Sequence, residues 1–323
     1  MTPRARVVLL VALAAAAVAA ATVGAVVLQG GGEETEAAPQ RPQGAPPLLL
    51  ELGVRDDAEA RELRRAEELW SDGRHAEARA IFARHDSTEA RIGAALARWP
   101  DGAVPALRRL AGELPRRADV RLNLGFALFW SGRREQAVEA WREARRVQPD
   151  SLAAVRAGDL LFPQYARGLP VFVPSFEPPQ EIRALPEDEQ LRRLRAAAAR
   201  GGTREKLLYG VALQRIGRPI SARRAYDRAA ALAPDDPEPL VAAAVARFDK
   251  ASPEAAFSRL GPLARRFGDD PSVRFHLGLL LLWIGELEDA RRQLTLARAA
   301  DPAHPLAREA AAYLERLEDV ESR

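Results

Sequence analysis

A set of small, large and helix-ending residues recurs three times in this chain at one internal spacing. The clearest copy runs from Ala118 to Ser151 and reads ADVRLNLGFALFWSGRREQAVEAWREARRVQPDS. This pattern predicts two helices joined by a tight turn at Ser131-Gly132, with small residues where the helices approach closely and a proline after the second helix. In every copy a glycine lies 7 residues before a turn glycine and 24 residues before a proline: Gly125, Gly132 and Pro149; Gly210, Gly217 and Pro234; Gly278, Gly285 and Pro302.

The repeated unit resembles the tetratricopeptide repeat, a helix-turn-helix of 34 residues. The residues that match its pattern are Leu124, Gly125, Leu128, Ala137, Trp141 and Pro149, whereas Arg121 stands where the pattern has tryptophan. The other strong copies are 203–236 and 271–304, and weaker pairs are expected at 56–86, 87–114 and 237–270, with a closing helix at 305–318. The resemblance implies an all-α solenoid over residues 56–320, because one helix pair cannot bury its apolar face without neighbours.

One stretch is too long for a single repeat. Leu152–Leu161 and Glu187–Arg200 are expected to be the two helices of a split pair, with a proline- and aromatic-rich insertion at about 162–186 between them. Proline prevents the insertion from being helical. Val171–Val173, bounded by Pro170 and Pro174, is therefore predicted to be extended, and Phe172 within it needs cover from water.

The amino terminus has the pattern of a membrane anchor. Residues 7–28 carry no charge and would span about 33 Å as a helix, enough for a hydrocarbon core of about 30 Å. Arg4 and Arg6 predict that residues 1–6 are cytoplasmic, which makes the chain a single-pass protein of the cell membrane with its carboxyl-terminal domain outside the cytoplasm. The alternative is a signal peptide that is cleaved near Ala19–Ala21. Residues 29–55 are predicted to be a flexible linker, in which the apolar patch 48–54 is expected to pack onto the first helices.

Composition and motifs exclude several classes of function. The net charge of +3 includes Arg4 and Arg6, so the rest of the chain is nearly balanced and nucleic acid is not expected as a partner. No cysteine is present, the four histidines have no metal-ligand spacing, and no nucleotide-binding or hydrolase motif occurs. We therefore expect no catalytic residues, no metal and no cofactor. A rival interpretation is an enzyme subunit whose chemistry lies in the 161–186 insertion and uses Tyr165.

The resemblance implies that a partner's segment binds along the concave surface formed by the first helix of each repeat. The slots that face this groove in the family fall on Asp119, Leu122, Phe126, Phe129 and Trp130 in the central repeat, on Arg204, Leu207, Val211, Gln214 and Arg215 in the next strong repeat, and on Ser272, Phe275, Leu279, Leu282 and Trp283 in the last. Two interpretations remain open: the groove takes a protein or peptide partner, or the chain's own segment 171–176 fills it.

These observations favour a membrane-anchored bacterial scaffold or assembly adaptor that binds proteins at the cell envelope. A secreted soluble binder is the alternative if the amino-terminal segment is cleaved.

Overall fold

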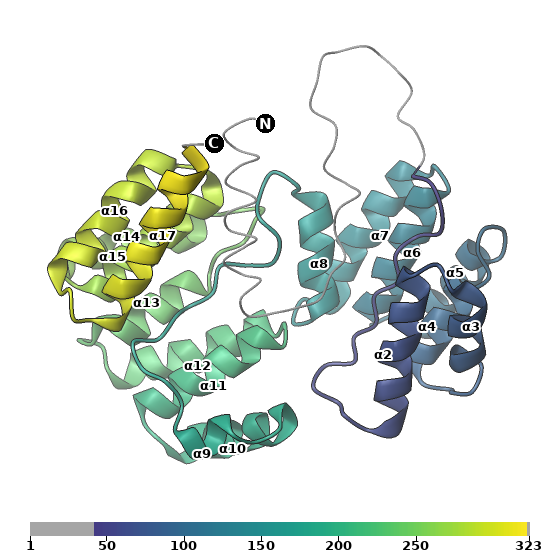
Figure 1. Cartoon of the computed structure of the whole chain (residues 1–323), viewed down its shortest axis with the longest axis horizontal. Helices are drawn as coiled ribbons and strands as arrows, with labels where there is room; N and C mark the ends of the chain where they lie inside the picture. The colour runs from purple at the N-terminus through teal and green to yellow at the C-terminus, as the bar shows by residue number, and fades with distance from the viewer. Residues whose placement is uncertain (1–41, 322–323) are drawn as a thin grey trace, which may run out of the picture. The chain divides into compact units, whose positions relative to one another are not determined.

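The computed structural model describes residues 42–321, whose regular structure is entirely helical (Figure 1). Contacts divide the described chain into an N-terminal unit, residues 42–161, and a C-terminal unit, residues 162–321. The expected cytoplasmic residues 1–6, the anchor at 7–28 and the first part of the linker lie outside the described residues. Within 42–321, no helix has both the length and the hydropathy needed to cross a membrane.

The N-terminal unit consists of three helix pairs and a further helix. The pairs are α2 (Ala58–Ser71) with α3 (His75–Phe82), α4 (Thr88–Leu96) with α5 (Ala103–Glu113), and α6 (Ala118–Trp130) with α7 (Arg134–Val147); α8 (Leu152–Leu161) follows. Asp57 and Ser87 cap α2 and α4 by accepting hydrogen bonds from main-chain N–H groups of the first turn. The predicted weaker pairs of this half of the chain therefore form.

The C-terminal unit begins with the insertion and two helices, α9 (Gln180–Arg183) and α10 (Glu187–Arg200). Three pairs follow and a last helix closes the unit: α11 (Thr203–Arg215) with α12 (Pro219–Leu232), α13 (Pro237–Val245) with α14 (Glu254–Arg266), α15 (Pro271–Ile284) with α16 (Leu287–Ala300), and then α17 (Pro305–Glu321). Each pair packs on its successor, and α17 packs on α15 and α16. The described chain is thus an all-α array of stacked helix pairs.

Close helix approach explains the repeated glycines. A Cβ atom added at Gly125 would overlap the Trp141 indole, and one added at Gly210 would overlap the Tyr226 ring. At Gly278 the added Cβ would lie 2.9 Å from Leu294 Cγ. Each large residue is 16 positions after its glycine. The first helix therefore has a glycine at the point where a large side chain of the second helix packs against it. These three pairs also make the most extensive helix–helix interfaces of the described chain.

Two boundaries differ from the sequence-based expectation. The helices predicted to form one split pair, α8 and α10, belong to different units: α8 packs on α6 and α7, and α10 packs on α11. The reason is that residues 166–176 of the insertion pack on α11, α13 and α15 of the C-terminal unit. The packed part of the chain also begins before residue 56, because Leu48, Leu50 and Leu52, in the patch expected to pack onto the first helices, are buried.

Candidate functional site

In both units a non-helical segment of the chain lies against the first helices of the pairs. In the N-terminal unit this is segment 46–52, in which Leu48, Leu50 and Leu52 are buried and the residues between them are half-buried. Alternate burial is the pattern of an extended chain with one face on a surface. The expectation that the apolar patch 48–54 packs onto the first helices is therefore confirmed for residues 48–52.

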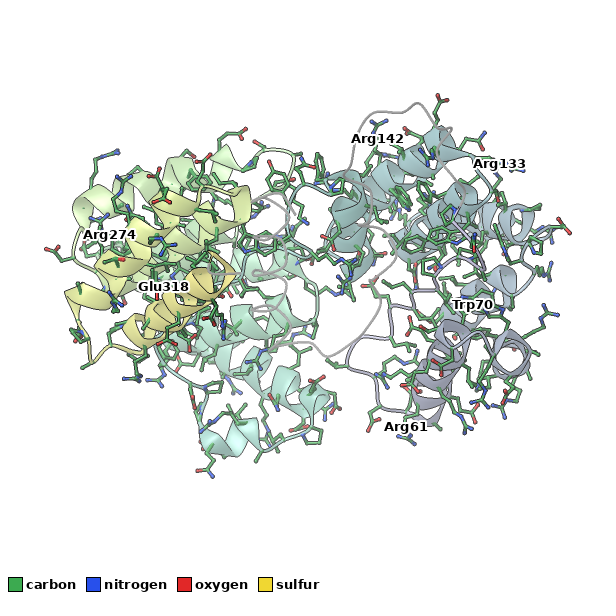
Figure 2. The ribbon with its side chains drawn as sticks, turned by 45° about the horizontal axis from the view of Figure 1, so that its top comes forward. Arg61, Trp70, Arg133, Arg142, Arg274 and Glu318 are labelled. Atoms are coloured by element: carbon green, nitrogen blue, oxygen red, sulfur yellow. The ribbon has the colours of Figure 1, made fainter. Side chains whose placement is uncertain are left out.

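Polar side chains of α2 and α6 hold the main chain of segment 46–52. The N–H of Leu49 donates to Asn123 Oδ1 (3.1 Å), and Asn123 Nδ2 donates to the C=O of Leu49 (2.8 Å). The N–H of Leu50 donates to Glu67 Oε1 (2.9 Å), and the Trp70 indole, labelled in Figure 2, donates to the C=O of Pro46 (2.9 Å). The face thus binds main-chain groups, which every polypeptide carries.

Burial gives Glu67 an unusual ionisation. Desolvation raises the pKa of its carboxyl group from 4.5 to about 7, although the N–H of Leu50 and the charge of Arg64 act in the opposite direction. The folded chain therefore binds this proton more tightly than the unfolded chain does. The contribution of Glu67 to stability is most favourable below pH 4.5 and declines as the pH rises to about 7.

We expect Glu67→Gln to raise the free energy of unfolding at pH 8 by about 1–2 kcal/mol, since glutamine keeps an acceptor for Leu50 N–H and carries no charge to desolvate. Urea unfolding at pH 5 and pH 8 measures the effect, which should be absent at the lower pH. Glu139→Gln, at an exposed position (71% of the side chain), is the control. An equal gain from the control would contradict the assignment.

In the C-terminal unit the corresponding segment is 166–176, part of the insertion. Phe172 is buried (1% exposed), with its ring edge-on to Tyr226 (centroids 5.5 Å apart) and stacked on His276 (5.1 Å). Val171 beside it is 43% exposed. Of the two interpretations left open by the sequence, self-filling of this groove is the one that the structure contains.

Four polar side chains bind the main chain of segment 166–176: three belong to first helices and one belongs to a loop. Gln214 of α11 accepts from the N–H of Phe172 (3.1 Å) and donates to its C=O (3.3 Å). The N–H of Val173 donates to His276 Nε2 (3.0 Å) and that of Ser175 to Glu238 Oε1 (2.6 Å). Lys250, after α13, donates to the C=O of Ala166 (2.5 Å). The segment thus crosses α11, α13 and α15.

His276 is held in one neutral form by its neighbours. Its Nδ1 donates to the C=O of Ser272 (2.7 Å), which leaves Nε2 as the acceptor for Val173 N–H. Desolvation in this fully buried position lowers the pKa of the imidazole from 6.5 to about 4, against the opposing effect of the Ser272 carbonyl. Protonation of Nε2 would remove the acceptor on which segment 166–176 depends.

The two units use equivalent positions for this purpose. Asn123 lies two residues before Gly125, and His276 lies two residues before Gly278. Each side chain accepts a hydrogen bond from a main-chain N–H of the segment. Asn123 and Gln214 each bind both main-chain groups of a single residue. Each first-helix face is therefore a surface that binds extended polypeptide, and each is occupied by the chain itself.

The predicted groove residues fall into three groups. Those buried in the units are Asp119, Leu122, Phe126, Leu207, Ser272, Phe275, Leu279, Leu282 and Trp283. Those in contact with segment 166–176 or its continuation are Gln214 and Arg204, whose guanidinium lies 4.4 Å from the Phe176 ring centre. Those at least partly exposed are Phe129, Trp130, Val211 and Arg215.

Burial corrects the view that all fifteen predicted positions face an open groove. Asp119 is fully buried and pairs with Arg117, which also bonds Glu89 (2.7 Å), so its carboxylate serves the α4–α6 contact. Of the central repeat's five positions, Phe129 and Trp130 near the carboxyl end of α6 keep a partly exposed face.

Sequence reasoning missed Asn123, His276, Glu67 and Glu238. Asn123 and His276 had a visible signal, because each is a polar residue inside an otherwise apolar helix run, LNLGFALFW and FHLGLLLLW. Glu67 and Glu238 lie in the weak repeats, whose match to the family pattern is too poor to indicate groove-facing positions. Tyr165, named for the rival enzyme interpretation, packs edge-on to Phe248 (6.4 Å). Among residues 42–321 no cluster of side chains suits a metal ion.

The Tyr226 hydroxyl, on the ring that packs edge-on to Phe172, destabilises the C-terminal unit because it is buried without a hydrogen bond to any described residue. Desolvation raises the pKa of this hydroxyl well above 10. We expect Tyr226→Phe to stabilise the C-terminal unit by about 1 kcal/mol, because it removes an unsatisfied polar group and keeps the ring. Urea unfolding tests this, with Tyr313→Phe, whose ring packs on Phe275, as the control. A loss of stability for Tyr226→Phe would show that the hydroxyl has a partner.

Comparison with known proteins finds similar solved structures at low sequence identity. No family model matches the chain, and no curated protein matches it. Among solved structures, it is similar to YrrB, described as a TPR protein with an unusual peptide-binding site (16% identity, 65% of this chain and 100% of that one, TM-score 0.31). It is also similar to the APC/C hetero-tetramer Cut9–Hcn1 (13% identity, 80% of this chain and 46% of that one, TM-score 0.32). The fold assignment rests on the helix pairing and glycine contacts described above.

Proposed function

We propose that this protein is a membrane-tethered scaffold of the tetratricopeptide type that binds other proteins at a bacterial cell envelope and performs no catalysis. The observation that carries the proposal is the main-chain binding by both first-helix faces. Asn123 and Gln214 each bind the N–H and C=O of one residue in an extended segment. Such contacts suit the binding of polypeptide, with affinity from the main chain and specificity from side-chain pockets.

We expect a partner protein to contact the aromatic surface that segments 46–52 and 166–176 leave uncovered. Phe129 and Trp130 are partly exposed at the end of α6, and their ring centres are 5.7 Å apart. Arg134 lies 5.4 Å from the centre of the Phe129 ring. Tryptophan and arginine are enriched among the few residues that contribute most of the binding energy in protein–protein interfaces. We place the partner contact of the N-terminal unit at this aromatic end of α6.

The tether is the segment 7–28, which in this proposal keeps the two units outside the cytoplasm and close to the bilayer. Its uncharged length and the preceding Arg4 and Arg6 support that orientation. Membrane fractionation and the mass of the mature chain test it. We expect a full-length chain that stays in the membrane fraction after extraction with alkaline carbonate. A shortened chain in the soluble fraction would instead support the secreted binder.

Site-specific photo-crosslinking in cells tests the scaffold itself. A photoreactive amino acid at position 130 should yield discrete crosslinked proteins. The same group at Leu296, an exposed position on the second helix α16 (43% exposed), is the control. Identical crosslinking patterns from the two positions would overturn the partner contact at α6.

A further inference from the structure

We propose that the first-helix face of the C-terminal unit is an exchangeable peptide site, and that segment 166–176 is its intramolecular competitor. The external ligand is an extended, uncharged segment of another protein that places one aromatic side chain between two prolines. This inference rests on the proposed scaffold function and names the ligand class of one of its faces.

The polar character of the face favours exchange. Gln214, His276 and Glu238 come from three first helices and bond to N–H groups of the segment. When the segment leaves, these side chains become hydrated instead of remaining buried without partners, so the departure does not strand a polar group in an apolar core. A face that only needed permanent cover would be served as well by apolar residues.

One large anchor holds segment 166–176, in contrast to segment 46–52. Phe172 is its only large side chain that is fully buried, whereas segment 46–52 buries three leucines. Val171 is 43% exposed, and Leu169, Val173 and Phe176 are half-buried. The residues around the anchor, LPVFVP, therefore define the ligand: an aromatic side chain in the pocket between Tyr226 and His276, and prolines that keep the chain extended.

The resident segment also leaves one group of the pocket unsatisfied. The Tyr226 hydroxyl, fully buried and 16 positions after Gly210, has no partner in the described chain while Phe172 occupies the pocket. The resident segment compensates through its tether, since covalent attachment provides an effective concentration of order millimolar.

A peptide with the sequence GLPVFVPSF, residues 168–176, tests the proposal on the full chain in detergent. Phe172→Ala removes the resident anchor and should open the site. Fluorescence anisotropy should show binding of the labelled peptide to this variant at least tenfold tighter than to the wild-type chain, in which the segment competes. A peptide with alanine in place of the central phenylalanine should bind at least tenfold more weakly than the parent peptide.

Two further variants separate the site from nonspecific binding. Gln214→Ala combined with Phe172→Ala should weaken peptide binding about tenfold, since both main-chain bonds at the anchor are lost. Val171→Ala changes a neighbouring exposed residue of the same segment and should leave binding as weak as in the wild type. Equal binding to wild-type, Phe172→Ala and doubly substituted chains would overturn the proposal.

Hydrogen exchange of the wild-type chain provides a test without substitution. The amides of Phe172, Val173 and Ser175 should exchange faster than the interior amides of α11 and α15, because the segment opens while the helices stay folded. Exchange of both sets only through global unfolding, or helix loss in Phe172→Ala by circular dichroism, would overturn the proposal and show that the segment is a permanent part of the core. Crosslinking at position 130 is independent of this face, so it distinguishes failure of the exchangeable site from failure of the scaffold function.

Discussion

Gly125→Leu is expected to destabilise the N-terminal unit by about 3 kcal/mol or more. Even a Cβ atom at this position would overlap the Trp141 indole, and Trp141 is itself buried (5% exposed) between α6 and α7. A leucine can be accommodated only if the two helices separate or the indole leaves its place, where its Nε1 donates to the C=O of Leu122 (3.3 Å). Overpacking of this kind typically costs about 1–3 kcal/mol, and more where a buried hydrogen bond is lost as well.

Gly112→Ala is the matched control for this experiment. Gly112 lies in α5 of the same unit, is exposed, and has no atom within 4 Å of the position of an added Cβ. Alanine there should stabilise the helix by up to about 1 kcal/mol through its higher helix propensity. Urea unfolding monitored by tryptophan fluorescence compares the two. If Gly125→Leu proves as stable as the wild type, α6 and α7 do not pack as described.

Acidification is expected to destabilise the C-terminal unit by about 3 kcal/mol between pH 6.5 and pH 4 through His276. The unfolded chain binds a proton on this imidazole with a pKa near 6.5, while in the folded chain burial lowers the pKa to about 4. Within that window the unfolded state binds more protons, so stability falls as the pH falls. The contribution is fully present above pH 6.5. A shift of about 2.5 pKa units corresponds to roughly 3 kcal/mol.

His276→Gln should make the unfolding free energy of the C-terminal unit much less dependent on pH over the same window. Glutamine does not titrate, and its carbonyl oxygen keeps an acceptor for the Val173 N–H that now bonds Nε2 (3.0 Å). Urea unfolding at pH 4.5 and pH 7 measures the difference between variant and wild type. The same pH dependence in both chains would exclude His276 as its source.

The helix pairs could be predicted because their signal is local and repeated. Gly125 with Trp141 and Gly210 with Tyr226 are pairs at fixed separation, so one contact in space appears as one spacing in sequence. The helix caps are also local: Ser87 begins α4 and Asp270 begins α15 through side-chain bonds to the first turn. Local signals of this kind do not depend on how distant parts of the chain meet.

The occupants of the faces could not be predicted to the same degree, because their contacts are long-range. Leu49 and Asn123 are 74 residues apart, and Val173 and His276 are 103 apart. The family pattern indicated that Gln214 faces the groove, but it did not indicate a partner. In the structure that partner is the main chain of Phe172. It also counted Phe275 and Trp283 as available surface, whereas both are buried within the C-terminal unit.

The carboxamides of Asn123 and Gln214 have a consequence for how this chain tolerates mutation. Both contact N–H and C=O groups that remain the same whichever side chain a residue carries. Among replacements at Leu49 and Phe172, only proline also removes one of these main-chain groups, because it lacks the N–H. The outward-facing Val171 can therefore change to almost any residue while its stretch of chain stays attached, so genetic drift there leaves the architecture intact.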